Sequence, residues 1–320
     1  MNNYGICIES SHQRGMGHLF RAINFIGYLK TVGERYIVFL NDDAISIKIL
    51  KEKEILYQIV DYSDEKSNWE EGFIKQYEIN VWLLDKFCTS VKLCEHVKKT
   101  GILLAGIDDT GEGAGLIDIH FYCMLYKIYK GRKIYKGEKY IVLNPEIATY
   151  RRVRREIRRI LVTLGGSDTY GATLLVVEKL REKNYTADIL TGPNFRHMSE
   201  LKKLAGEKYS IYQNVSSLIE KMSEYDLAIT GGGVTPIEAC ASGLPCIIVA
   251  NEMHEIELAE HMQMLGVAVF AGYYKEINDD KLVFERLDIE KMSNLGLETF
   301  TLDGAKNIYE KIKEDVKYAG

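Results

Sequence analysis

Residues 226–251 read D-L-A-I-T-G-G-G-V-T-P-I-E-A-C-A-S-G-L-P-C-I-I-V-A-N. The apolar run 227–230 is typical of a strand that is buried in a parallel sheet. The glycines at 231–233 then allow a sharp turn and leave room for a group close to the backbone. A short helix follows, which Gly243 can end, before residues 246–249 form the next strand. The stretch therefore predicts a strand–turn–helix–strand unit of an α/β fold.

The glycine turn also predicts an anion-binding site. Backbone N–H groups at a helix start, together with the helix dipole, favour a negatively charged group such as a diphosphate. The residues placed to contact it are Gly232, Gly233 and Thr235. Thr235 and Glu238 also have the spacing of a capping box, with Thr235 as the N-cap residue. The alternative is a plain connecting turn in which Glu238 serves only as a cap.

Length and composition indicate a globular protein of two domains. The chain has 320 residues, of which 46% are hydrophobic and 27% charged. It has no run of about 18 apolar residues and no secretory leader, so we expect a cytoplasmic protein without membrane insertion. The six cysteines lack C-x-x-C spacing, which favours free thiols over a zinc site. The net charge of −5 argues against nucleic-acid binding, and the oligomeric state stays open.

Alternating apolar runs and helical stretches predict two Rossmann-like domains in tandem, whose parallel sheets face a central cleft. We expect the first domain at 1–150 and the second at 151–320, with the terminal helix able to pack back on the first. Strands are expected at 4–9, 36–40, 57–60, 80–84, 103–107, 117–123, 140–143, 159–164, 187–190, 209–212, 227–230, 246–249 and 267–270. The boundary segment 144–159 carries six arginines, which indicate a solvated connecting helix rather than a basic ligand-binding patch.

The loop after the first expected strand contains a candidate general base. Gly15 and Gly17 permit a tight turn, and His18 falls at the start of a helix. The positive end of the helix dipole favours a neutral imidazole, which can accept a proton. The alternative is a histidine that only caps the helix. Arg21, one turn later, can anchor a phosphate or carboxylate, or form a surface ion pair.

A second glycine turn at Gly166 and Ser167 also precedes an expected helix. It can help to hold a diphosphate, or Ser167 and Asp168 can simply cap that helix. Asn251 follows a strand and is placed to hydrogen-bond a sugar hydroxyl. The spacing of metal ligands is approached only weakly, by His254, Glu255 and His261, so no metal or cofactor is expected.

Two aspartates, Asp85 and Asp108, also follow expected strands. Such residues commonly form turns, and this is the interpretation we prefer for both. The alternative places their carboxylates at the ligand-binding edge of the sheet.

Taken together, these motifs resemble the UDP-2,4-diacetamido-2,4,6-trideoxy-β-L-altropyranose hydrolases of pseudaminic acid biosynthesis and their spore-coat polysaccharide relatives. That family has the GT-B fold and is related to MurG-type glycosyltransferases. The matching pieces extend over nearly the whole chain. They are G-M-G-H-L-F-R at 15–21, I-D-D at 107–109, Y-I-V-L-N-P-E at 140–146, L-V-T-L-G-G-S-D at 161–168, the stretch 226–245 and D-G-A at 303–305.

The resemblance implies an inverting hydrolase that needs no metal and acts on a UDP-sugar. It implies that His18 is the base that deprotonates water and that Glu238 holds the ribose hydroxyls. The residues implied for UDP binding are Gly166, Ser167, Gly232, Gly233, Thr235 and Glu238. The residues expected to contact the rest of the substrate are Gly15, Gly17, Arg21, Asp85 and Asn251.

The chain departs from the family at two places on the sugar side. The family usually has Asp-Ser-Tyr where this chain has Asp85-Lys86-Phe87, so a hydroxyl is lost. The family's Ala-Asp and Asn-rich strand end is replaced by I-D-I-H-F-Y at 117–122, which includes His120. Two other functions therefore stay open: a GT-B glycosyltransferase with a carbohydrate or lipid-linked acceptor, and a non-catalytic protein that binds nucleotide sugars.

Overall fold

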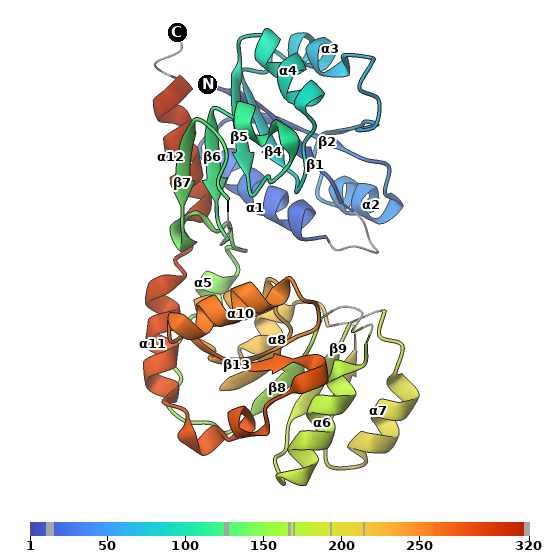
Figure 1. The fold of residues 1–320 in the computed structure, drawn as a ribbon, viewed down its shortest axis with the longest axis vertical. Helices are drawn as coiled ribbons and strands as arrows, with labels where there is room; N and C mark the ends of the chain where they lie inside the picture. The colour runs from blue at the N-terminus through green and yellow to red at the C-terminus, as the bar shows by residue number, and fades with distance from the viewer. Residues whose placement is uncertain are drawn as a thin grey trace. The chain divides into compact units, whose positions relative to one another are not determined.

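The structure is a computed structural model and describes residues 1–10, 16–124, 128–165, 168, 170–192, 194–213 and 215–316. The chain divides into two compact units, Met1–Asn144 with Asp303–Gly320 and Pro145–Leu302. It leaves the first unit at Pro145, earlier than the expected boundary at residue 151, and returns at Asp303. The last helix therefore belongs to the first unit (Figure 1).

The first unit contains a seven-stranded parallel sheet in the order β3-β2-β1-β4-β5-β6-β7. Its strands are β1 (Asn3–Ile8), β2 (Arg35–Leu40), β3 (Tyr57–Ile59), β4 (Val81–Asp85), β5 (Leu103–Ile107), β6 (Ile119–Tyr122) and β7 (Lys133–Lys136). Its helices are α1 (Gly17–Thr31), α2 (Ala44–Glu52), α3 (Trp69–Gln76), α4 (Val91–Lys99) and α12 (Gly304–Val316), with 3₁₀ turns η1 (Glu112–Leu116) and η2 (Glu138–Tyr140). Because all strands run parallel, their carboxyl ends share one edge.

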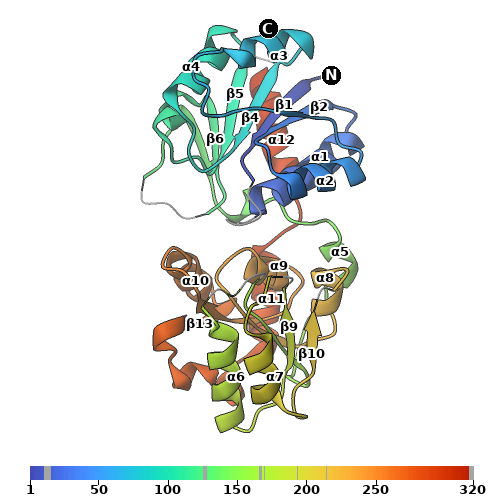
Figure 2. The same ribbon diagram turned by 90° about the vertical axis from the view of Figure 1, so that its right-hand side faces the viewer.

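Apolar side chains cover both faces of this sheet, as parallel sheets require. On one face, the ring of Tyr4 in β1 lies 6.2 Å from the ring of Phe25 in α1. On the other face, Phe39 of β2 stacks on Trp82 of β4 with 5.0 Å between ring centres, in a core that α3 and α4 complete. Helix α12 lies beside α1 (Figure 2).

The returning helix α12 makes a close backbone contact with the first unit. A Cβ atom at Gly304 would lie 1.8 Å from the carbonyl oxygen of Ile141, so only glycine fits there. The Asn307 side chain donates to the carbonyl oxygen of Lys139 at 2.7 Å. The D-G-A motif is therefore the joint at which α12 docks.

The second unit contains a six-stranded parallel sheet in the order β10-β9-β8-β11-β12-β13. Its strands are β8 (Ile160–Thr163), β9 (Asp188–Thr191), β10 (Ile211–Gln213), β11 (Leu227–Thr230), β12 (Cys246–Ala250) and β13 (Ala268–Tyr273). Its helices are α5 (Ile147–Tyr150), α6 (Ala172–Glu182), α7 (Met198–Ala205), α8 (Leu218–Met222), α9 (Thr235–Ala241), α10 (Glu255–Met264) and α11 (Ile289–Thr299), with 3₁₀ turns η3 (Tyr274–Glu276), η4 (Asp279–Leu282) and η5 (Phe284–Arg286).

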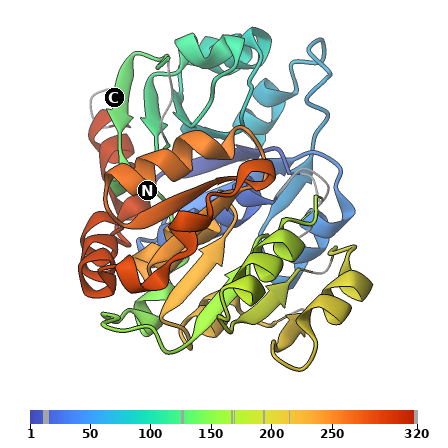
Figure 3. The same ribbon diagram turned by 60° about the horizontal axis from the view of Figure 1, so that its bottom comes forward.

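Buried aliphatic side chains such as Val162, Ile229 and Ile247 form the core of this second sheet together with residues of α6 and α7. Helices α6 and α7 lie side by side (Figures 1 and 2). Helix α10 lies along the edge strand β13 (Figure 3). The strand–turn–helix–strand expectation for 226–251 is confirmed, and Gly243 ends α9 with φ +79°.

Two expectations for the middle of the chain are wrong. Residues 140–143 form no strand; the last strand of the first sheet is β7, which the sequence analysis did not single out. Strand β7 is a partly exposed edge strand that begins and ends with lysine, so it lacks the apolar run used to identify strands. Residues 151–159 are not a solvated helix either, because α5 ends at Tyr150 and no helix follows before β8.

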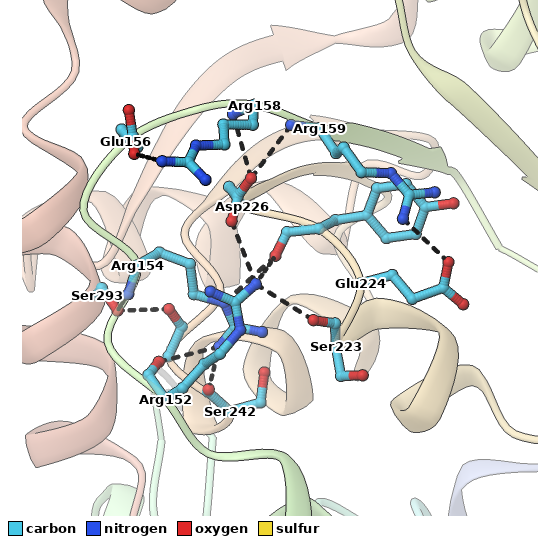
Figure 4. Close-up of polar contacts among 12 residues, drawn as sticks. Arg152, Arg154, Glu156, Arg158, Arg159, Ser223, Glu224, Asp226, Ser242 and Ser293 are labelled. Carbon is cyan, nitrogen blue, oxygen red and sulfur yellow. Dashed lines mark hydrogen bonds and ion pairs between the residues drawn. The ribbon is translucent and has the colours of Figure 1, made fainter.

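Arg154 explains why this arginine-rich segment is held to the second unit. Its side chain is fully buried, and it donates to the carbonyl oxygens of Tyr225 at 3.3 Å, of Arg152 at 3.1 Å and of Ser242 (Figure 4). Burial, reinforced by the Arg152 charge, lowers the pKa of Arg154 to about 10. Asp226 binds the same segment by accepting from the backbone N–H groups of the last two arginines at 3.1 Å each.

We expect Arg154→Ala to lower the free energy of unfolding by about 3 kcal/mol, because it leaves a cavity and buried carbonyl oxygens without donors. The matched control is Arg155→Ala, which removes an exposed ion pair with Glu290 at 3.0 Å and should cost no more than about 0.5 kcal/mol. Urea denaturation of both variants checks this. Equal losses would show that Arg154 does not anchor the segment.

Candidate functional site

His18 lies in the first turn of α1, which starts at Gly17. Its Nδ1 atom is 2.6 Å from Oδ1 of Asp85, the last residue of β4. Its Nε2 atom is buried and has no hydrogen-bond partner within the described residues. When the Asp85 carboxylate accepts the Nδ1 proton, the neutral ring presents Nε2 as a proton acceptor. The pair therefore has the geometry of a base and the carboxylate that orients it.

Arg21 holds Asp85 in place. Its Nη2 atom lies 2.5 Å from Asp85 Oδ1, its Nε lies 3.0 Å from Oδ2, and its Nη1 donates to Asp108 at 2.5 Å. Burial alone would raise the pKa of Asp85, but the Arg21 charge and the His18 hydrogen bond hold it below its usual value. Arg21 and Asp85 are thus bonded to each other, and Asp85 also holds the His18 ring. That either residue contacts a substrate stays a prediction.

Asp108 completes this network from the neighbouring strand end. It follows β5 directly, and its backbone has the left-handed φ of +54°, which is uncommon for a residue other than glycine. Its Oδ1 atom accepts from the N–H of Cys123 at 2.8 Å. The expectation that Asp85 and Asp108 form turns misses this role, although their positions at the ends of adjacent parallel strands were a usable signal.

The two departures from the family pattern have different structural meanings. The Phe87 ring is 61% exposed and packs edge-on against His18, with 4.3 Å between ring centres. His120 is fully buried and has both ring nitrogens in use, since Nε2 accepts from the N–H of Asp109 at 3.1 Å and Nδ1 donates to the carbonyl oxygen of Lys130 at 2.7 Å. Burial lowers the pKa of His120, so it is a neutral structural residue.

In the second unit, the predicted anion site at the glycine turn holds a carboxylate of the chain itself. Oε2 of Glu255 accepts from the N–H groups of Gly232 at 3.2 Å, of Asn251 at 2.7 Å and of Glu252 at 3.3 Å. A Cβ atom at Gly232 would lie 2.5 Å from Cβ of Glu255, so this position needs glycine. The sequence analysis singled out Glu255 only for its weak metal-ligand spacing; its role at the turn was not anticipated.

The first N–H groups of helix α6 also bind a carboxylate of the chain itself. Both carboxylate oxygens of Asp168 accept N–H groups of α6, from Ala172 and Thr173, at 2.8 Å each. Capping by Asp168 is therefore confirmed. Gly233 and Thr235 are different, because the described residues provide no hydrogen-bond partner for the N–H of Gly233 or for the Thr235 hydroxyl.

The Asn251 side chain links the ends of β12 and β8 by one hydrogen bond, and its other polar atom has no partner among the described residues. Its Nδ2 donates to the carbonyl oxygen of Leu164 at 2.8 Å. Its Oδ1 is buried and lacks a partner in the described part of the chain. Thr230, which ends the neighbouring strand β11, also has a buried hydroxyl without such a partner. Buried polar atoms of this kind call for a ligand or ordered water at these strand ends.

The capping-box expectation is wrong. The N-cap residue of α9 is Val234, which makes no side-chain capping hydrogen bond, and Thr235 is already helical. The carboxylate of Glu238 receives no hydrogen bond from the described residues. Burial, reinforced by the nearby charge of Glu146, raises the pKa of Glu238 to about 7. Glu146 accepts from the hydroxyl of Ser217 at 2.8 Å, a contact that only the fold reveals.

The remaining site predictions are placed as follows. Gly15, Gly166 and Ser167 lie outside the described residues. Gly17 is the first residue of α1, and no atom lies within 4 Å of the place a Cβ would take, the helix's own backbone aside.

Among the described residues, no group of three or more His, Cys, Asp or Glu side chains could hold a metal ion. No helix in that part of the chain is both long and apolar enough to cross a membrane.

Two proteins are similar to this chain in sequence. The spore coat polysaccharide biosynthesis protein SpsG of Bacillus subtilis is 22% identical over 306 residues, which cover 88% of this chain and 87% of SpsG. The uncharacterized protein MJ1062 of Methanocaldococcus jannaschii is 24% identical over 272 residues. That match covers 78% of this chain but spans little more than half, 56%, of the archaeal protein. No protein-family model matches the sequence.

Solved structures establish the fold. MurG of Acinetobacter baumannii superposes with a TM-score of 0.72 at 13% identity, over 98% of this chain and 100% of MurG. Staphylococcus aureus MnaA, solved with UDP, gives 0.67 at 12% identity over 99% and 97%. UDP-GlcNAc 2-epimerase of Neisseria meningitidis, bound to UDP-GlcNAc, gives 0.64 at 12% identity over 98% and 100%. The chain therefore has the GT-B fold, with two Rossmann-like domains, as the sequence predicts.

The raised pKa of Glu238 predicts a pH-dependent effect on stability. Between the unfolded value of 4.5 and the folded value of about 7, the unfolded chain ionises while the folded one does not, so stability falls as pH rises. We expect Glu238→Gln to unfold at a higher temperature than wild type at pH 8, with a gain of about 2 kcal/mol, and to gain little at pH 5.

Thermal unfolding followed by circular dichroism at pH 5 to 8 measures this difference. The control is Glu207→Gln, which changes an exposed glutamate of the same unit and should leave the pH dependence of wild type intact. A gain that is the same at pH 5 and pH 8 would contradict the assignment.

Proposed function

We propose that the protein cleaves the anomeric C–O bond of a UDP-linked amino or deoxy sugar with inversion, and releases UDP and the free sugar. The observation that carries this proposal is the His18–Asp85 pair. Its Nδ1 and Oδ1 atoms are 2.6 Å apart, and the buried Nε2 atom of His18 has no hydrogen-bond partner among the described residues. The similarity to SpsG supports a place in surface polysaccharide or nonulosonic acid biosynthesis. Structures of the same fold hold UDP or UDP-GlcNAc, which supports a UDP-sugar as the ligand.

In this mechanism the first unit supplies the base. His18 takes a proton from water at Nε2 while water attacks the anomeric carbon, and the bond to UDP breaks. The carboxylate of Asp85 fixes the ring tautomer and stabilises the imidazolium that forms. Arg21 keeps Asp85 ionised and in position, and Asp108 in turn holds Arg21. A base that is preorganised in this way contributes roughly 10²–10⁴-fold to a rate.

The second unit binds the nucleotide in this proposal. The Gly232 N–H group is bound to the Glu255 carboxylate, so Gly233 and Thr235 are the donors that the turn offers to the diphosphate. Glu238, which lacks a donor among the described residues, accepts the ribose hydroxyls. Asn251 offers its open Oδ1 to a sugar hydroxyl. By the family resemblance, Gly166 and Ser167 also belong to the diphosphate site.

A glycosyltransferase is the second candidate, because the first unit has a hollow on the same edge of the sheet as Asp85. A hollow of about 660 Å³ lies at the carboxyl ends of β1, β2 and β3. Its walls include Glu9, Asn41, Asp42 and Asp61. An acceptor hydroxyl in place of water would use the same base, His18.

We expect wild type to release UDP from a UDP-sugar in the absence of an acceptor. His18→Ala should lower that turnover by at least about 100-fold while UDP still binds, since only the base is lost. Asp85→Asn should lower it by a similar factor, because the ring loses its orienting charge. The measurement is UDP release from a panel of UDP-sugars that includes UDP-2,4-diacetamido-trideoxyhexoses, together with calorimetric UDP binding.

The matched control is His96→Ala, which removes another histidine–carboxylate pair of the first unit, His96 with Glu70 at 3.1 Å. This variant should turn over like wild type. Turnover of His18→Ala within about threefold of wild type would refute the base assignment. If UDP binds but release begins only when an acceptor is added, the transferase is the correct function.

A further inference from the structure

Three tyrosines gather at the carboxyl ends of β12 and β13. Tyr273 is the last residue of β13 and pairs with Ala250 of β12. The Tyr170 and Tyr274 rings are stacked, with 4.9 Å between centres and 13° between planes. The Tyr273 ring meets Tyr274 at 4.6 Å, edge-on. We call these three residues the tyrosine cluster.

A carboxylate accompanies the exposed member of this cluster, and an open amide oxygen belongs to the residue before that carboxylate in the chain. The Glu252 carboxylate lies close to the Tyr170 hydroxyl and raises its pKa. Glu252 directly follows Asn251, whose Oδ1 is the buried acceptor without a partner in the described residues. Tyr170 is 47% exposed although its ring is stacked, so an aromatic surface lies beside the Glu252 carboxylate.

This combination matches the chemistry of a hexose ring. A pyranose has an apolar C–H face that packs on an aromatic ring, and a rim of hydroxyl or amide donors that carboxylate and amide oxygens accept. Tyrosine provides such a contact surface with little conformational entropy to lose. The Glu252 carboxylate makes this position unfavourable for a diphosphate, because the two negative charges repel each other.

The strand order separates the cluster from the proposed nucleoside contacts. β10 and β13 are the opposite edges of the sheet, and β11 with its glycine turn lies inside it. Glu238 is close enough to Glu146 for their charges to interact, and Glu146 binds Ser217, which follows β10 in the chain. Tyr273 ends β13. A nucleotide sugar whose ribose meets Glu238 and whose diphosphate meets the turn therefore directs its sugar towards β12 and β13.

We propose that Tyr170, stacked on Tyr274, and Glu252 form the subsite that binds the sugar ring of the substrate and select a sugar with a hydrogen-bond donor facing Glu252. This proposal rests on the proposed function, since it assumes that the second unit binds a UDP-sugar. Tyr170 and Glu252 are then specificity residues and take no part in bond cleavage.

Calorimetric titration with UDP, UDP-glucose and UDP-N-acetylglucosamine tests the subsite. For each protein the measured quantity is the ratio of the affinity for each UDP-sugar to the affinity for UDP. Tyr170→Ala should change this ratio by about tenfold while UDP affinity stays within about twofold of wild type. Glu252→Gln should shift the preference between the two UDP-sugars.

The chain offers a matched control pair away from this edge of the sheet. The Tyr185 hydroxyl donates to Glu285 at 2.6 Å, and its ring packs on Phe284. Tyr185→Phe and Glu285→Gln should leave all ratios as in wild type, whereas Tyr170→Phe should alter them less than Tyr170→Ala. Thermal unfolding of each variant verifies that it is folded.

The outcomes separate this proposal from the one on which it rests. If wild type binds no UDP, the proposed function fails and the subsite fails with it. If wild type binds UDP but Tyr170→Ala leaves every ratio unchanged, only the subsite is refuted. An equal loss of affinity for UDP and for the UDP-sugars would assign the tyrosine to the nucleotide and also refute the sugar subsite.

Discussion

The candidate base depends on one partly buried guanidinium that bridges two strand ends. Arg21 binds Asp85 at the end of β4 and Asp108 just beyond β5, and Asp85 in turn binds His18. Buried charges of this kind contribute little net stability as a set, yet loss of one partner leaves the others uncompensated. Their value is geometric, because two strands of a rigid sheet and the first turns of α1 fix the imidazole in one orientation.

In the second unit, two carboxylates near the proposed anion site are held by backbone N–H groups, whereas an arginine holds Asp85 in the first. The carboxylates of Glu255 and Asp168 accept backbone N–H groups at the glycine turn and at the start of α6. Glu238 has no such donor in the described structure, and its pKa rises to about 7. An ionised carboxylate that burial disfavours lowers the free energy of unfolding of the ligand-free protein. Such destabilising groups occur mainly at functional sites, where a ligand binds.

The sequence predicts much of the fold because buried parallel strands are apolar runs and glycine turns separate them from helices. It fails where that signal is absent: strand β7 begins and ends with lysine, and the arginines of 151–159 suggest a solvated helix although Arg154 is fully buried. Motifs locate His18 and the glycine turn, but partners such as Glu146 and Glu255 depend on tertiary contacts that local patterns do not encode.

The return of the chain at Asp303 has a consequence for biosynthesis. The first unit begins the chain, but its helix α12 comes from residues 304–316, after the whole second unit. During translation the second unit therefore leaves the ribosome complete before the first can dock its last helix. The first unit then has all seven strands of its sheet but lacks α12, and the surface of α1 that α12 later covers is still exposed. The domain that starts the polypeptide is thus the last to finish folding.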